Sequence, residues 1–178
     1  MSEQRMENIA ARRDIEYIQY RVFFHEEGVP SDYREMCRVL GGLSNSNFAS
    51  FFKKHEYDEG KIVEMAIGEN GRVVGFICLV AYRYSEFSYA NVWAHGLNGR
   101  YQSNREEIYK RMIENFFNNI RGDVTERGNK IIYIRVPNYP TERDHIPMWK
   151  KLGFEKDMLP REKGQEWYEG LVLRHDYE

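Results

Sequence analysis

The feature that most constrains the fold is a strand, a helix and a second strand in succession between residues 86 and 137. The run EFSYANVWAH (86–95) predicts a strand, an amphipathic helix is expected from about Asn104 to Arg121, and KIIYIRVP (130–137) predicts a central strand. A helix between two such strands forms a crossover, which makes the strands parallel neighbours. The chain is therefore predicted to be an α/β protein.

An antiparallel hairpin is expected before this unit. The segment KIVEMAIGENGRVVGFICLVAYRY (61–84) holds two apolar, β-rich runs on either side of Asn70-Gly71, which suits a tight hairpin turn. A short helix is predicted from Thr141 to Leu152, where Thr141-x-x-Asp144 resembles a capping box, and a last strand is predicted in EWYEGLVLRH (166–175). Together these segments predict a mixed sheet with helices on both faces.

The first third of the chain is predicted to be helical. Residues 12–27 carry apolar side chains at helical spacing. These side chains are Ile15, Ile18, Val22 and Phe23. A second helix is expected from Ser31 or Asp32 to about Leu40, and FASFFKKHEY (48–57) predicts a short third one.

The composition is that of a folded domain with little net charge. Of the 178 residues, 42% are hydrophobic and 30% charged, which is enough for one domain with its own core. The net charge is −2 and no segment gathers Lys and Arg without acids, so neither nucleic acid nor an anionic membrane is an expected partner. The longest apolar run, VVGFICLVAY, is much shorter than the ~20 residues of a membrane helix.

Cysteine and histidine usage argues against disulfide and metal chemistry. Cys37 and Cys78 lie far apart and outside any CxxC spacing, and Cys78 is expected to be a buried thiol in an apolar strand. The five histidines show no metal-ligand spacing, so no metal site is predicted. The N-terminal MSEQRMENIAARRD lacks the apolar region of a signal peptide, and a reducing, cytoplasmic location is expected.

Two motifs resemble blocks of the GNAT acyltransferase superfamily. The run IPMWKKLGFE, from Ile146 to Glu155, is similar to the family's block "AIPFYEKLGFE", and Gly153 within it is expected to end a helix at a tight turn. The segment YRVFFHEEGVPSD (20–32) resembles the family's first helix, often "RxxVFxxExGVP". With the order of predicted elements, the resemblance extends from about Ile15 to Leu173.

The resemblance implies one acyl-CoA N-acyltransferase-like domain over residues 1–178, with a mostly antiparallel sheet whose central parallel strands splay apart. Residues 12–56 would form the helical acceptor side, 61–121 the hairpin, central strand, CoA loop and helix, and 130–178 the C-terminal strands. The implied donor is acyl-CoA, usually acetyl-CoA as cosubstrate without a metal, and the implied acceptor is an amine. A homodimer is compatible with the sequence, which does not indicate the oligomeric state.

The loop after the first central strand holds the CoA pyrophosphate in this family and normally reads Q/R-x-x-G-x-G/A. Its counterpart here runs from Arg100 to Arg105, R-x-x-S-x-R, and lacks both glycines. Backbone N–H groups at a helix start bind phosphate, and here Ser103 would add a hydroxyl and Arg105 a guanidinium. Glu106 and Glu107 would repel an anion, and an ordinary capping box of Ser103 with Glu106 is the alternative. The resemblance thus implies these CoA contacts: Trp93, Ala94, His95, Arg100, Tyr101, Gln102, Ser103, Asn104, Arg105 and Trp149.

Acylation of an amine needs a base that takes the ammonium proton. The family often places a carboxylate on the strand before the loop, and Glu86 lies there if Val92 is the residue that contacts CoA. If the contact lies two or three residues later, Ser88 or Tyr89 takes that place. His95, at the end of the strand, is a further candidate because its reference pKa is about 6.5. A purely structural role is the alternative for each.

The family often protonates the leaving thiolate with a Tyr, and this position is Trp149 here. An indole N–H is not an acid near neutral pH, so Trp149 would pack on the pantetheine arm or in the core. Tyr82, Tyr84 and Tyr89 remain as candidate acids or pocket walls. His145 and Glu142 also depart from the family, which has a small residue and an Asn at these positions.

The sequence therefore predicts an acyl-CoA-dependent N-acyltransferase, a transferase of the N-acetyltransferase type. The altered loop and Trp149 leave a second hypothesis open, a GNAT-fold domain without catalysis that binds or regulates. A third is an acyl-chain signal synthase, because RVFFHEEGVP (21–30) resembles the first helix of acylhomoserine-lactone synthases. The LGF motif argues against that third hypothesis.

Overall fold

The computed structural model describes residues 15–22, 38–41, 51, 60–83, 88–126, 128–137, 140–157 and 170–178. Its strands are β1 (Glu16–Val22), β2 (Gly60–Ile67), β3 (Val73–Arg83), β4 (Ser88–Leu97), β5 (Ile131–Pro137), β6 (Glu155–Lys156) and β7 (Gly170–Asp176). Its helices are the 3-10 helices η2 (Gly99–Asn104) and η3 (Pro140–His145) and the α-helices α3 (Arg105–Thr125) and α4 (Ile146–Lys151). Residues 38–41 are also helical.

The strands form one sheet in the order β1-β2-β3-β4-β5-β7-β6, and every described pairing is antiparallel except that of β4 with β5. The predicted hairpin is confirmed as β2 and β3, with Gly71 at φ +70° in the turn. Asn70 Oδ1 accepts a hydrogen bond from the Arg72 backbone N–H at 3.1 Å. The predicted crossover is confirmed as well, since α3 joins the parallel strands β4 and β5.

One prediction for the N-terminal third was wrong. Residues 16–22 form the edge strand β1, paired antiparallel with β2, where a helix over 12–27 was expected. Ile15 and Tyr17 pack against the core on the α3 side, and Ile18 and Tyr20 against the core of the opposite face. Because both faces of the sheet are covered, the alternation of a strand buries apolar residues on both sides, and this can imitate helical spacing.

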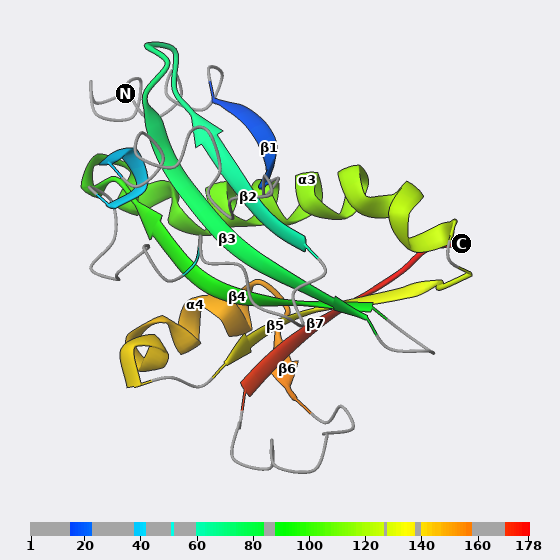
Figure 1. The fold of residues 1–178 in the computed structure, drawn as a ribbon. Helices are drawn as coiled ribbons and strands as arrows, with labels where there is room; N and C mark the ends of the chain where they lie inside the picture. The colour runs from blue at the N-terminus through cyan, green and yellow to red at the C-terminus, as the bar shows by residue number, and fades with distance from the viewer. Residues whose placement is uncertain are drawn as a thin grey trace.

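Helix α3 covers one face of the sheet, where it packs across β1, β2 and β3 (Figure 1). Its buried residues join those of the sheet in the larger core. The opposite face has a smaller core of strand residues with Leu40 and Phe51, both with no exposed surface. Leu40 belongs to the helical residues 38–41 and Phe51 lies in a turn, while the other residues of the predicted second and third helices lie outside the described ones.

Helix α4 is shorter than predicted. The α-helix begins at Ile146, after the 3-10 helix η3, and its N-cap His145 makes no side-chain capping bond. The predicted capping box of Thr141 with Asp144 is therefore not the start of this helix. Pro147 explains the shift, because proline has no N–H to donate and is tolerated only in the first turn of a helix.

The end of α4 was predicted correctly. Gly153 has φ +92°, its N–H donates to the Lys150 carbonyl, and the Phe154 N–H donates to the Trp149 carbonyl, both at 3.1 Å. These two bonds form a Schellman motif, which favours glycine at the left-handed position. Phe154 is then buried in the larger core.

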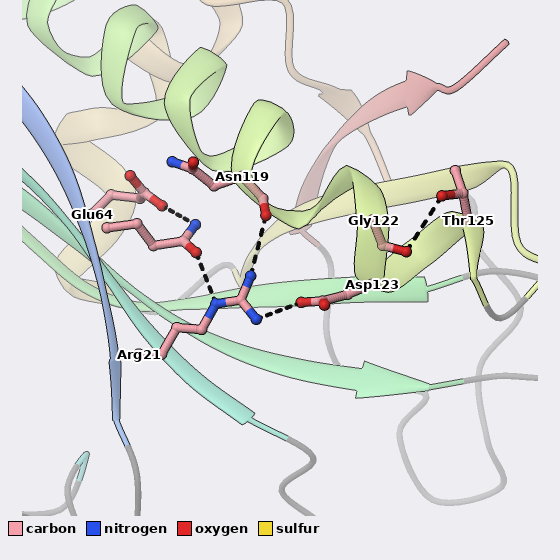
Figure 2. Close-up of polar contacts among 7 residues, drawn as sticks. Arg21, Glu64, Asn119, Gly122, Asp123 and Thr125 are labelled. Atoms are coloured by element: carbon pink, nitrogen blue, oxygen red, sulfur yellow. Dashed lines mark hydrogen bonds and ion pairs between the residues drawn. The ribbon is translucent and has the colours of Figure 1, made fainter.

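Strand β1 is held to β2 and α3 by a buried carboxylate and its partners, which we call the β1 clamp (Gln19, Arg21, Glu64, Asn115 and Asp123). Glu64 has no exposed surface and accepts one bond from Gln19 Nε2 at 2.5 Å and one from Asn115 Nδ2 at 2.7 Å. Arg21 donates from Nε to Gln19 Oε1 and pairs with Asp123 on α3 at 2.7 Å (Figure 2).

Candidate functional site

The pairing of the two central parallel strands ends abruptly. It runs from Ser88 opposite Ile132 to Asn91 opposite Arg135, although β4 continues to Leu97. Beyond Asn91, the second half of β4 pairs only with β3 among the described strands. The predicted divergence of these strands is thus confirmed. It leaves the carboxyl end of β4 without a strand partner on its inner edge among the described residues, and this is where α/β sheets tend to bind ligands.

A β-bulge lies directly beyond the last paired residue. Leu79 of β3 stands opposite Val92, but Cys78 stands opposite Ala94, so that Trp93 is the extra residue. Trp93 has 39% of its surface exposed and is the large hydrophobic residue most open to solvent in the described part of the chain. Bulges re-aim the side chains that follow them. Cys78 is buried, as predicted.

The bulge places the candidate catalytic residues on opposite faces of the sheet. Tyr89, before the bulge, lies 6% exposed on the face away from α3, where the Arg135 guanidinium carbon stands 5.9 Å from its ring centroid. His95, after the bulge, faces α3 and lies 2.7 Å from the Tyr109 hydroxyl through its Nδ1. Glu86, Tyr84 and the side chain of Tyr82 lie outside the described residues. Of the candidate bases and acids, Tyr89 and His95 are therefore not brought together.

His95 belongs to an aromatic cluster that joins β4 to both helices on this face. Its ring makes edge contacts with Tyr109, His145 and Trp149, at centroid distances of 5.5, 4.7 and 5.2 Å. Trp149 has no exposed surface and also contacts Tyr109 and Phe154. Trp149 is thus a core residue in this structure, and its indole lies beside an imidazole and a phenol that can exchange protons.

The segment predicted to hold pyrophosphate forms the 3-10 helix η2. The Arg100 N–H donates to the Asn98 side chain, the Tyr101 N–H to the Asn98 carbonyl and the Arg105 N–H to the Gln102 carbonyl. A 3-10 helix also uses its inner N–H groups for bonds to the carbonyl three residues earlier. The backbone donors of this segment are therefore largely engaged, and side chains carry its remaining capacity for phosphate.

The start of α3 does not have the side-chain capping that its sequence allows. The N-cap is Asn104, and no side chain caps the helix, so the capping box of Ser103 with Glu106 is not formed. Glu106 instead pairs with Lys151 of α4 at 2.7 Å, and Glu107 pairs with Arg111 at 3.0 Å. Both acids at the helix start thus have a cation beside them, which reduces their repulsion of a bound anion.

Sequence reasoning missed three polar residues at the end of the parallel pair, which we call the strand gap (Asn91, Arg135 and Asp157). Arg135 and Asp157 are buried, with 8% and 2% of their surface exposed, and Arg135 Nε donates to Asp157 Oδ2. Asn91 stands directly opposite Arg135 in the strand register. The signal was present in KIIYIRVP, because a lone arginine in an otherwise apolar central strand needs a buried partner.

Two features are absent from the described residues. They contain no group of three or more His, Cys, Asp or Glu side chains placed to hold a metal ion. Nor does the described part of the chain include a helix of the length and hydrophobicity that a membrane crossing requires.

Comparison with known proteins supports the fold. No protein-family model and no curated protein matches the sequence. Among solved structures, GCN5 from Tetrahymena is similar with a TM-score of 0.55 at 13% identity, over 89% of this chain and 98% of that chain. NAA60 from Arabidopsis thaliana in complex with a bisubstrate analogue gives 0.51 at 13% identity, over 91% and 98%. An N-acetyltransferase from Staphylococcus aureus Mu50 gives 0.51 at 12% identity, over 90% and 97%. With its strand order and the one parallel pair among its described strands, the chain has the fold of the GNAT acetyltransferases.

Proposed function

We propose that this protein is an N-acyltransferase that moves an acyl group, most simply acetyl, from acyl-CoA to an amine of a small molecule or a protein. The observation that carries the proposal is the end of strand pairing at Asn91 and Arg135, with the bulge at Trp93 beside it. An extended acyl-CoA arm would pair with the open edge of β4 through the backbone of Trp93, Ala94 and His95. The arm would thus complete the sheet where β5 leaves it.

The pyrophosphate would lie against η2 and the start of α3. Arg100 is exposed and Arg105 partly exposed, so both guanidinium groups are available for phosphate, and Ser103 adds an exposed hydroxyl. Tyr101, Gln102 and Asn104 complete this contact surface in the proposal. The engaged backbone donors of η2 mean that side chains would supply more of the binding than in a glycine loop.

We further propose that the Tyr109 hydroxyl supplies the proton for the leaving thiolate in place of Trp149, which cannot. Tyr109 is hydrogen-bonded to His95 and in ring contact with Trp149. Its hydroxyl therefore lies next to the position where an acid is needed, and it can regain its proton from His95 after donating it. Glu86 would take the amine proton, and Tyr89 would act only as a hydrogen-bonding relay, since a phenol that keeps its own proton cannot take up another.

A second candidate function is a GNAT-fold domain that binds or regulates without catalysis. The observation that favours it is the 3-10 helix at the expected pyrophosphate loop, which engages the backbone donors. Thermal unfolding with acetyl-CoA separates the two functions. A ligand at a hundredfold excess over its Kd stabilises the native state by about 2.7 kcal/mol.

Stabilisation by acetyl-CoA that falls in the Arg100→Ala/Arg105→Ala double variant would support the enzyme. The absence of any stabilisation by acetyl-CoA, longer acyl-CoAs or free CoA would leave the regulatory domain. With turnover established, Tyr109→Phe tests the proton donor. A slower rate with acetyl-CoA binding unchanged is expected, and an unchanged rate contradicts that role.

A further inference from the structure

The strand gap holds two polar atoms without a hydrogen-bond partner in the part of the chain that the structure describes. Among the described residues, Nη2 of Arg135 and Oδ1 of Asn91 are buried and have no hydrogen-bond partner. Buried polar groups in native proteins almost always have one, so each such atom calls for an explanation. Here a donor and an acceptor occur on two residues that stand directly opposite each other on adjacent strands.

The two atoms lie on the same side of the sheet. Ala90 and Ile134, the preceding register pair, both point into the core beneath α3, so Asn91 and Arg135 point to the opposite face. Arg135 is 8% exposed there, over the ring of Tyr89, whereas Asn91 is partly exposed. Neighbouring strands are ~4.8 Å apart, so one small group can reach both residues. Because Asn91 is partly exposed, such a group can reach this place from solvent.

The charge of the strand gap limits what this group can be. The guanidinium of Arg135 is already paired with the buried carboxylate of Asp157. A second anion would leave a net negative charge in a buried place, and a cation would lie against the guanidinium, both of which are unfavourable. The group is therefore neutral. It accepts a hydrogen bond from Arg135 Nη2 and donates one to Asn91 Oδ1.

Amides and hydroxyls are neutral groups that can both donate and accept a hydrogen bond. Resting on the proposed N-acyltransferase function, we infer that the acceptor amine carries a neutral amide or hydroxyl close to its amino group, which the strand gap binds. The position suits this role, because Asn91 and Arg135 end the strand pairing beside the open edge of β4. Amines with a carboxylate or only hydrocarbon at this place would be poor acceptors.

Four amines of nearly the same size test the inference: alaninamide, alaninol, alanine and 2-aminobutane. The first two carry a neutral amide or hydroxyl, the third a carboxylate and the fourth an ethyl group. With acetyl-CoA as donor, kcat/KM is expected to be at least about tenfold higher for the first two, since a site built to hydrogen-bond a polar group rejects an analogue without it. Equal kcat/KM for all four would overturn the inference.

Two variants assign the preference to the strand gap. Asn91→Leu removes the acceptor, and Arg135→Lys keeps the charge beside Asp157 but removes Nη2. Both should abolish the preference and leave stabilisation by acetyl-CoA unchanged. Arg174→Lys is the matched control, because Arg174 is exposed on β7 and bonded to Asp176. A preference that survives both variants overturns the inference, and so does loss of acetyl-CoA binding, which would assign the atoms to the donor.

Thermal unfolding with each amine alone separates this inference from the proposed function. Wild type should be stabilised more by alaninamide and alaninol than by alanine and 2-aminobutane, and Asn91→Leu should remove that difference. This result in a protein that acetyl-CoA does not stabilise would uphold the strand gap as a binding site and reject the acyltransferase. The absence of any difference in wild type would overturn the inference without use of a variant.

Discussion

The β1 clamp and the strand gap both bury a charged side chain on the sheet, but they differ in how completely their polar atoms are hydrogen-bonded. In the β1 clamp both carboxylate oxygens of Glu64 accept hydrogen bonds, and Arg21 fixes the orientation of Gln19 from its other side. In the strand gap Arg135 is paired with Asp157, yet one of its nitrogens and the facing Asn91 oxygen have no partner among the described residues. A structural network satisfies its own groups, whereas a binding site keeps some for its ligand.

The largest expected effect comes from breaking the buried ion pair of the strand gap. Asp157→Leu leaves the Arg135 guanidinium buried without its carboxylate, and loss of one partner of a buried pair typically costs about 3–5 kcal/mol. The free energy of unfolding from urea titration should fall by that amount. The double variant Arg135→Met/Asp157→Leu removes both charges and should recover most of the loss. A double variant as unstable as the single one would show that packing, and not charge, is responsible.

The β1 clamp should make the stability of the protein depend on pH. Burial raises the pKa of Glu64 from 4.5 to about 7, against the opposing effect of the bonds from Asn115 and Gln19. The native carboxyl therefore holds its proton more tightly than the unfolded one, and stability falls as the pH rises from about 4.5 to 7. One pKa unit corresponds to 1.36 kcal/mol, so the whole loss is about 3 kcal/mol.

Glu64→Gln removes this titration and is the control. Because Arg21 holds Gln19 as a donor, Asn115 has to turn its amide to meet the new side chain. The difference in free energy of unfolding between the variant and wild type should grow in favour of the variant between pH 4.5 and 8. A constant difference over that range would mean that Glu64 keeps an ordinary pKa in the folded protein.

The sequence was sufficient for much of the fold because several elements are encoded locally. The turn at Gly71 and the Schellman motif at Gly153 each need a glycine at positive φ, and both were identified from the sequence. Strand β1 was not predicted from the sequence, because its apolar residues lie on two buried faces and their spacing also fits a helix. Its strand conformation depends on pairing with β2, about 45 residues away, as the bond from Gln19 to Glu64 shows.

The candidate site was less predictable because it depends on one extra residue. Tyr89 and His95 are six positions apart, which would place both on one face of a regular strand, and the bulge at Trp93 separates them. No local pattern in EFSYANVWAH marks that bulge. Arg135 was visible in the sequence as a charge in an apolar strand, but its partner Asp157 is brought to it only by the turn of the chain after α4.

Two asparagines offer a direct comparison of the β1 clamp with the strand gap. Asn115→Leu removes a bond to a buried carboxylate, which should lower the free energy of unfolding by about 1.5–3 kcal/mol. Asn91→Leu removes an unsatisfied buried oxygen, so it should be neutral or raise the free energy of unfolding by about 1 kcal/mol. Urea titration at pH 7 measures both. Equal destabilisation by the two substitutions would mean that Asn91 is as fully bonded as Asn115.

The smallest expected effect lies at the edge of the β1 clamp, where Arg21 pairs with Asp123. The two side chains are 40% and 45% exposed, so water and salt weaken the attraction, and such pairs contribute about 0.2–1 kcal/mol. Asp123→Asn should therefore lower the free energy of unfolding by less than about 1 kcal/mol, and 1 M salt should remove the difference. Arg21 keeps its bonds to Gln19 and to the Asn119 carbonyl in this variant. A loss of several kcal/mol that persists in salt would mean that the orientation of Gln19, and with it the environment of Glu64, depends on the exposed pair.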